Sequence, residues 1–360
     1  MPLHNLMHWS PFRLDALGLV TLIGAEEVNQ AIGRLVDSKY TTFLPLLGQY
    51  LISGNQFTTA VPGFTLYNVT DAITTTSFAG WFSRWLRSQD LKTSKTVFEW
   101  NVLPKNRRRE KGGLSILIGG SILTAMLALT VLMGDWWGVA NSIALLVSVV
   151  VRWYLIRENS RGLNQTCQNA CYTSQQMTRV KVLVTLDNGN LVTIYAPRGL
   201  VTSGFLKVPA PINPLFYTWT RRAGWLFFGV HVIALGQCNL VTQLLTVALL
   251  VGSTWLVVRG FGCDETEVGD SIRVRRISNT FRGETDRRMW AYVKLRPTQE
   301  EEDSLSVWNL LPRKVNANWW KEYESAKQSM VLSEKSSTFS TVTSRSDSGL
   351  STMSATSSDV

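Results

Sequence analysis

The stretch that decides the fold is Gly113–Met133, GLSILIGGSILTAMLALTVLM, which contains no charged side chain. A helix needs about 20 predominantly apolar residues to cross a hydrocarbon core about 30 Å thick, and this stretch is long enough. Its composition therefore predicts a transmembrane helix. The other apolar stretches can be placed relative to it.

A second apolar stretch, Trp136–Ile156, follows after only Gly134 and Asp135. Two spans joined by so short a turn must lie antiparallel and adjacent. Arg152 is the only charged residue of the second span and stands near one of its ends. We expect its long side chain to carry the guanidinium to the headgroup layer; the alternative is a functional buried charge.

Two further stretches, Ala223–Gln237 and Leu240–Val258, predict a second hairpin. The predicted fold class is a membrane all-α bundle of about four transmembrane helices in two hairpins, with a small cytosolic β-containing domain and a disordered C-terminal tail. The predicted regions are a cytosolic N-terminal region with an amphipathic helix (1–112), the first hairpin (113–156), a cytosolic segment with a β-hairpin (157–222), the second hairpin (223–258), a cytosolic C-terminal region (259–332) and a disordered Ser/Thr-rich tail (333–360).

Basic residues outnumber acidic ones, 36 to 26, and give a formal net charge of +10. Because they crowd beside the apolar stretches, we expect them to contact anionic lipid headgroups rather than nucleic acid. All four basic clusters flank spans, and neither tight turn contains Lys or Arg, so the positive-inside tendency predicts cytosolic termini. Hydrophobic length does not separate the endoplasmic reticulum from the plasma membrane, and both stay open.

Small residues recur every four positions in the first two spans. Such spacing lets helix backbones approach closely in a membrane, so we expect the two stripes to face each other; the alternative is that small residues are simply common in spans. The first stripe is Gly120, Thr124 and Ala128, and the second is Ala140, Ala144 and Ser148.

The predicted cytosolic parts carry weaker patterns. Residues 17–35 have apolar positions at helical spacing, which predicts an amphipathic helix. Residues 41–63 are apolar but broken by Pro and Gly, so both a peripheral and a re-entrant position stay open. The last residues are rich in Ser and Thr, which predicts a disordered tail, and Ser278 follows an Arg pair as in basophilic kinase sites.

A β-hairpin is predicted around the Asn188-Gly189 pair, which is the preferred centre of a type I′ turn. This turn would set Leu186 opposite Leu191 and Val184 opposite Thr193. Both faces of the hairpin are apolar, so further strands must cover it. The candidates are residues 272–276 and 289–295.

The sequence gives little sign of chemistry. Its 4 cysteines and 3 histidines are too scattered for a zinc site, and it has no phosphate-binding loop, so we expect no metal and no cofactor. Asp135 and His231 are weak candidates for acid–base catalysis. For His231, a neutral ring bonded between helices is the commoner situation.

The run from Gly134 to Asn141, GDWWGVAN, resembles a pattern found in membrane proteins of filamentous fungi that have no assigned function. The resemblance covers the first hairpin best and implies a membrane topology, but it brings no catalytic residues. The residues expected to anchor the helix ends at the membrane interface are Trp136, Trp137, Arg152 and Trp153.

The function expected from these patterns is a non-enzymatic membrane adaptor, anchor or signalling component, with protein partners or self-association. Two alternatives stay open. One is a membrane-embedded enzyme acting on a lipophilic metabolite of secondary metabolism, and the other is a small oligomeric channel. No predicted span contains a carboxylate of the kind that carriers use to bind substrates, so transport has little support.

Overall fold

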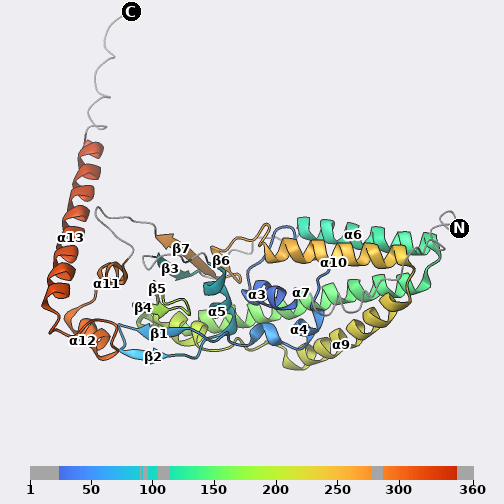
Figure 1. Cartoon of the computed structure of the whole chain (residues 1–360), viewed down its shortest axis with the longest axis horizontal. Coiled ribbons are helices and arrows are strands. Elements are labelled where there is room, and N and C mark those ends of the chain that lie inside the picture. Colours follow the sequence, from blue (N-terminus) through green and yellow to red (C-terminus); the bar gives the residue numbers. More distant parts are fainter. Residues whose placement is uncertain (1–23, 90, 92–95, 104–112, 278–286, 347–360) are drawn as a thin grey trace, which may run out of the picture.

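The structure is a computed structural model that describes residues 24–89, 91, 96–103, 113–277 and 287–346. Four long helices lie along the long axis of the molecule (Figure 1). They are α6 (Gly113–Met133), α7 (Trp136–Ala170), α9 (Pro214–Gln237) and α10 (Leu240–Val258). We call this part the helical half.

Three of these helices, α6, α7 and α10, are long and apolar enough to cross a membrane. The prediction of about four spans is wrong in this respect, because α9 does not meet the same measure. Arg221 and Arg222 lie directly before its apolar part, and His231 lies within that part. α9 nevertheless runs back along α7 to the turn that leads into α10 (Figure 1).

The other half of the molecule is built on a seven-stranded mixed sheet of order β2-β1-β4-β5-β3-β7-β6. Its strand pairs are antiparallel except β3 with β5, which is parallel. The strands are β1 (Thr65–Asn68), β2 (Ile73–Thr75), β3 (Thr96–Val102), β4 (Arg179–Thr185), β5 (Leu191–Pro197), β6 (Glu267–Val268) and β7 (Ile272–Ile277).

The predicted fold class, an all-α bundle with a small β-containing domain, is therefore wrong. The sheet domain is larger, because strands from before α6, between α7 and α9, and after α10 combine in one sheet. The physical reason is the β4–β5 hairpin, which is buried on both faces and needs strands on either side as well as cover above and below. The strands before α6 were missed because they are short or carry polar residues within them.

The β4–β5 hairpin has a different register from the predicted one. Val184 pairs with Val192 and Leu183 with Thr193, one position away from the prediction. The loop is longer than a two-residue turn: the Leu186 amide donates to the Asn190 carbonyl, and Gly189 alone among its residues has a positive φ, 77°. A three-residue loop with Gly in the left-handed position shifts the register by one and so exchanges the side-chain faces.

Residues 289–295 form a helix, α11 (Arg288–Leu295), and not the predicted strand. Every residue from Met289 to Leu295 is buried, so these apolar side chains fit a helix enclosed on all sides. Helices α12 (Gln299–Val307) and α13 (Ala317–Ser346) complete a cover over the outer face of the sheet.

Helix α13 projects away from the sheet domain (Figure 1) and continues to Ser346. Residues 333–346 are therefore helical, which corrects the prediction of a disordered tail from residue 333; residues 347–360 lie outside the described part. Extending an existing helix costs far less free energy than starting one, so the packed turns of α13 can continue into a Ser/Thr-rich stretch.

The opposite face of the sheet packs against short helices and an aromatic core. Helix α3 (Ala25–Gly33) buries Val28 and Ile32 and covers the described part of the predicted amphipathic helix. The rings of Trp81, Phe82, Trp85, Trp100 and Phe205 contact one another in this core. The remaining short elements are α4 (Gln49–Ser53), η1 (Gln56–Thr58), α5 (Gly80–Ser88), α8 (Ser174–Met177) and η2 (Leu200–Phe205).

Candidate functional site

A non-helical segment, residues 41–48, is inserted between the long helices and leads into α4. The backbone of Phe43 lies against Gly119 of α6, where a Cβ atom would come within 2.4 Å of the Phe43 carbonyl oxygen. The Leu47 amide donates to Thr254 Oγ1 of α10 at 3.1 Å. Irregular backbone at membrane depth is tolerated only where protein covers it, and the helices provide that cover.

Arg152 of α7 is 2% exposed and binds this inserted segment. Its Nη2 donates to the carbonyl oxygens of Thr42 and Leu44, both at 2.6 Å. The guanidinium is therefore enclosed by protein, and its place at the depth of the headgroup layer stays a prediction. The inserted segment brings carbonyl groups to the guanidinium inside the helical half, and a pattern of spans alone does not contain that information.

Two further arginines bind carbonyl groups of residues 53–56, which follow the inserted segment in the sequence. Arg221 of α9 donates from Nε to the Ser53 carbonyl at 2.9 Å and from Nη2 to the Gly54 carbonyl at 3.2 Å. Arg84 of α5 donates from Nη2 to the Gln56 carbonyl at 3.0 Å. Arginines from three helices thus satisfy the backbone of one irregular segment, and two of them belong to the helical half.

A small cavity lies between the inserted segment, α7 and α9. Its volume is about 10 Å³, and its polar lining comes from Gln49, Ser148, Arg152 and His231. Arg152 Nη1 is buried and has no hydrogen-bond partner among the described residues. Gln49 Nε2 donates to the Ser148 carbonyl at 3.1 Å. The cavity therefore brings a charged donor and further polar groups to a space large enough for one water molecule or small ion.

His231 lines this cavity and also begins a chain of hydrogen bonds that joins α9, α7 and α10. Its Nδ1 lies 2.6 Å from Asn141 Oδ1, and Asn141 Nδ2 donates to Thr246 Oγ1 at 3.0 Å. The Thr246 hydroxyl donates in turn to the Thr242 carbonyl at 2.8 Å, so its oxygen must accept from the Asn141 amide. The Asn141 oxygen therefore faces the histidine, and His231 Nδ1 carries the hydrogen.

Asp135 caps α7 and joins the two turns of the helical half. Its Oδ1 accepts from the Gly138 amide at 2.9 Å. Its Oδ2 accepts from the Asn239 amide at 3.1 Å and from Thr242 Oγ1 at 2.8 Å. Both candidates for acid–base chemistry, Asp135 and His231, thus hold helices together. Asp135 is not among the residues that line the cavity.

The stripe of small residues on α6 does not face α7. Gly120, Thr124 and Ala128 are exposed, and a Cβ atom at Gly120 would meet nothing within 4 Å. The packed face of α6 is turned by one residue because Gly119 must lie against the Phe43 backbone. On α7, Ala144 and Ser148 are buried and Ala140 is half-buried.

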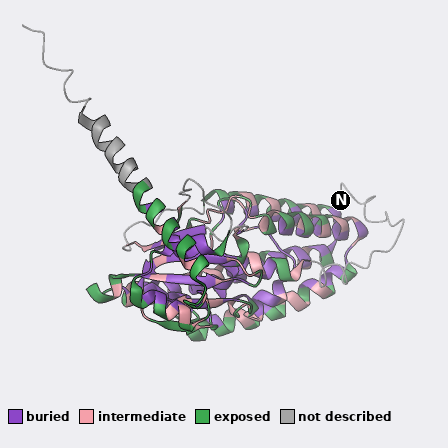
Figure 2. Ribbon diagram, turned by 60° about the vertical axis from the view of Figure 1, so that its left-hand side comes forward, coloured by how far each residue is buried: buried purple, intermediate pink, exposed green. Residues whose placement is uncertain are grey.

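Large apolar side chains are exposed along the long helices, and Figure 2 shows exposed residues on their outer faces. Trp136 and Trp137, at the turn, are 73% and 51% exposed, and their place at a membrane interface stays a prediction. Trp153 is half-buried under the Arg157 guanidinium, 4.8 Å from the ring centre. Other exposed large apolar side chains on these helices are Leu117, Leu215, Phe216, Trp219, Leu226, Ile233 and Trp255.

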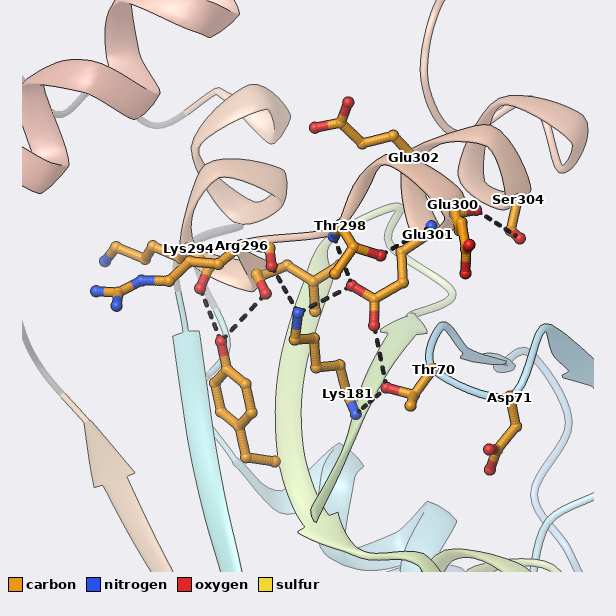
Figure 3. A network of polar contacts seen from close by, with 12 residues as sticks. Thr70, Asp71, Lys181, Lys294, Arg296, Thr298, Glu300, Glu301, Glu302 and Ser304 are labelled. Atoms are coloured by element: carbon orange, nitrogen blue, oxygen red, sulfur yellow. Dashed lines mark hydrogen bonds and ion pairs between the residues drawn. The ribbon is translucent and has the colours of Figure 1, made fainter. Parts of the chain in front are cut away.

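A second polar cluster joins the sheet to the C-terminal helices (Figure 3). Lys181 of β4 donates to Glu301 Oε2 at 2.9 Å and to the Arg296 carbonyl at 2.6 Å. The other oxygen of Glu301 accepts from Thr70 at 3.2 Å, and Thr298 and Glu301 form a capping box at the start of α12. Both oxygens of Glu301 therefore have partners.

The same junction contains a buried carboxylate, Glu302, which is 4% exposed. It accepts from the Tyr323 hydroxyl at 3.0 Å and from Lys327 Nζ at 2.7 Å, both on α13. Burial raises the pKa of Tyr323, and Glu302 raises it further. Burial also raises the pKa of Tyr292 of α11 to about 12. These side chains hold α13 on α11 and α12.

Ser278, the predicted phosphorylation site, lies outside the described residues. Within the described ranges, no group of three or more His, Cys, Asp or Glu side chains could hold a metal ion. The four cysteines are free.

No protein family, curated protein or solved structure matches this chain. The resemblance to fungal membrane proteins stays an expectation. Any function must therefore be argued from the residues of the chain itself.

Proposed function

We propose that this chain is a multi-pass membrane protein that acts as a non-enzymatic adaptor or anchor, with its sheet domain and both termini in the cytosol. This orientation requires α9 to return across the membrane beside α7, although α9 is less apolar than the other three long helices. The observation that supports the proposal is the division of the molecule. Most of the exposed large apolar side chains lie on the helical half, whereas the sheet domain exposes fewer of them and is covered by α11, α12 and α13. α7 belongs to both halves, because it continues past its apolar part to Ala170 beside the sheet domain.

The orientation rests on charge. Arg157 and Arg161 lie on α7 between its apolar part and the sheet, whereas the turns around Asp135 and Asn239 contain no Lys or Arg. Anionic lipid headgroups at the sheet side are the expected lipid partner. The expected protein partner, or second copy, binds the projecting part of α13. The membrane is the endoplasmic reticulum or the plasma membrane.

Labelling of single cysteines tests the topology. The partly exposed native Cys263 is replaced by Ser, and either Trp136 at the turn or Tyr172, which is 91% exposed after α7, is replaced by Cys. In sealed vesicles of known orientation, a membrane-impermeant maleimide should label W136C and Y172C from opposite sides, with Y172C on the cytosolic side. Labelling of both from one side, or of Y172C from the outside, would contradict the proposal.

A rescue experiment separates an adaptor from an enzyme or a pore. In a strain that lacks the protein and has a measurable defect, H231A should restore function. A chain ending at Leu332 keeps the packed residues of α13 but lacks its projecting part, and it should fail to restore function. The opposite pattern, with expression of both variants verified, would favour chemistry or conduction in the helical half.

A further inference from the structure

We propose that the cavity beside Arg152 is a binding site for one small inorganic anion of halide size. The site goes beyond the adaptor function and does not depend on it. It rests on three features of the structure: a buried guanidinium with a free donor, the missing carboxylate around it, and a cavity of matching size.

The guanidinium of Arg152 is buried without a counter-charge. Its two described acceptors are neutral carbonyl groups, and no carboxylate among the described residues forms an ion pair with it. Glu158 lies two turns further along α7, but its oxygens are engaged by the Asn213 amide at 2.7 Å and by Arg161 at 3.8 Å. Asp135 lies about 25 Å away along the same helix at 1.5 Å per residue. Buried charges in proteins are normally paired, so a diffusible anion would supply the missing partner.

The cavity is lined by Arg152, whose guanidinium has one donor without a partner among the described residues. Arg152 lines it and is 2% exposed, and its buried Nη1 donor finds no acceptor among the described residues. Gln49 also lines the cavity, and one hydrogen of its amide is used by the Ser148 carbonyl, which leaves the second hydrogen for a ligand. The site therefore offers donors of two kinds to an acceptor.

The size of the cavity selects the class of ligand. Its volume of about 10 Å³ admits one water-sized particle or a monatomic anion and leaves no room for a phosphate ester or a carboxylic acid. A single water molecule is the rival occupant. It would satisfy Nη1 by hydrogen bonding but would leave the charge uncompensated.

Chloride dependence distinguishes the two occupants. The full-length protein, purified in detergent, is unfolded by heat while chloride replaces gluconate at constant ionic strength. We expect a saturable rise of the melting temperature with chloride and with bromide. Radioactive chloride should bind at about one ion per chain, and R152Q should weaken this binding at least about tenfold.

The matched control is R222Q. Arg222 is on α9 in the helical half, but its guanidinium lies over the Trp219 ring at 5.2 Å and not in the cavity. R222Q should keep the chloride dependence. If R152Q fails to fold, the position of bromide in crystals of the wild-type protein decides: anomalous signal beside Arg152 supports the site, and signal only elsewhere overturns it. Absence of chloride binding to the wild type, or unchanged binding to folded R152Q, assigns the cavity to water.

Discussion

The junction with the C-terminal helices and the surroundings of Arg152 treat buried charge in opposite ways. At the junction between the sheet and the C-terminal helices, Glu301 meets Lys181 and Glu302 meets Lys327, and each carboxylate has hydrogen-bond partners from the chain itself. In the helical half, Arg152 meets only carbonyl groups and a cavity. The difference indicates that the junction is complete as it stands, whereas the helical half is built around a charge that needs something from outside the described chain.

The two regions also differ in how their irregular backbone finds hydrogen-bond partners. The loop that joins β4 and β5, Leu186–Asn190, closes mostly through its own hydrogen bonds. The inserted segment 41–48 instead takes a donor from α7, an acceptor from α10 and a close contact from α6. We therefore expect substitutions at these helix contacts to have the largest effects on stability.

The largest effect is expected for G119V on α6. A Cβ atom at Gly119 would overlap the Phe43 carbonyl, so the inserted segment or the helix must move, and unfolding should become easier by about 3 kcal/mol or more. The measurement is thermal unfolding of the purified protein in detergent, followed by tryptophan fluorescence.

The matched control for that prediction is G120V, one residue further on the same helix, where a side chain would meet nothing within 4 Å. Its effect should stay within about 0.5 kcal/mol. If G120V were the more damaging of the two, the stripe predicted from the sequence would face the bundle after all, and the inserted segment would lie elsewhere.

A smaller loss is expected for E302A at the junction. The substitution removes the acceptor of Tyr323 and the ion-pair partner of Lys327, and it should cost about 2 to 3 kcal/mol. Glu300, two residues before and exposed, provides the control, and E300A should change stability by less than about 0.5 kcal/mol. Equal effects of the two substitutions would show that α13 is not held by the buried carboxylate.

Alkaline pH should weaken the same junction through Tyr292. Its pKa of about 12 in the folded chain lies above the unfolded value near 10, so the folded state retains the proton longer. The stability that this group contributes is complete below pH 10 and is lost as the pH rises toward 12, by about 3 kcal/mol in total. Y292F removes the titration, so the difference in stability between wild type and Y292F should depend on pH only in that window. A difference that is flat across it would contradict the prediction.

The sequence predicted the apolar helices well because a run such as 113–133 has one physical interpretation. It predicted the contacts of those helices poorly. The rotation of α6 depends on where Phe43 passes, and the burial of Arg152 depends on the Thr42 and Leu44 carbonyls. Both partners are about 75 to 110 residues away in the chain, and local patterns carry no information about such contacts.

The sheet was predicted in part for the same reason. The β4–β5 hairpin is local and was recognised, but its register depended on a loop whose length a two-residue turn signal does not specify. The run 289–295 fits either a strand or a buried helix, because it is short and apolar apart from Lys294. In the candidate site, the available signal is the broken apolar stretch 41–63, for which the sequence leaves a peripheral and a re-entrant position open, and its interruptions mark the inserted segment.

The smallest expected effect is the difference in coupling energy between a buried and an exposed ion pair of the junction. Arg287 and Glu322 lie 2.9 Å apart, but their side chains are 66% and 54% exposed, whereas those of Lys181 and Glu301 are 24% and 10% exposed. Double-mutant cycles with Ala should give a coupling below about 0.5 kcal/mol for the exposed pair, because water and salt screen it. The Lys181–Glu301 coupling should be larger, about 1 to 2 kcal/mol, since each partner also binds a neighbouring group. If both couplings were equal and small, shape and not charge would hold the C-terminal helices on the sheet, and the contrast with Arg152 would lose its basis.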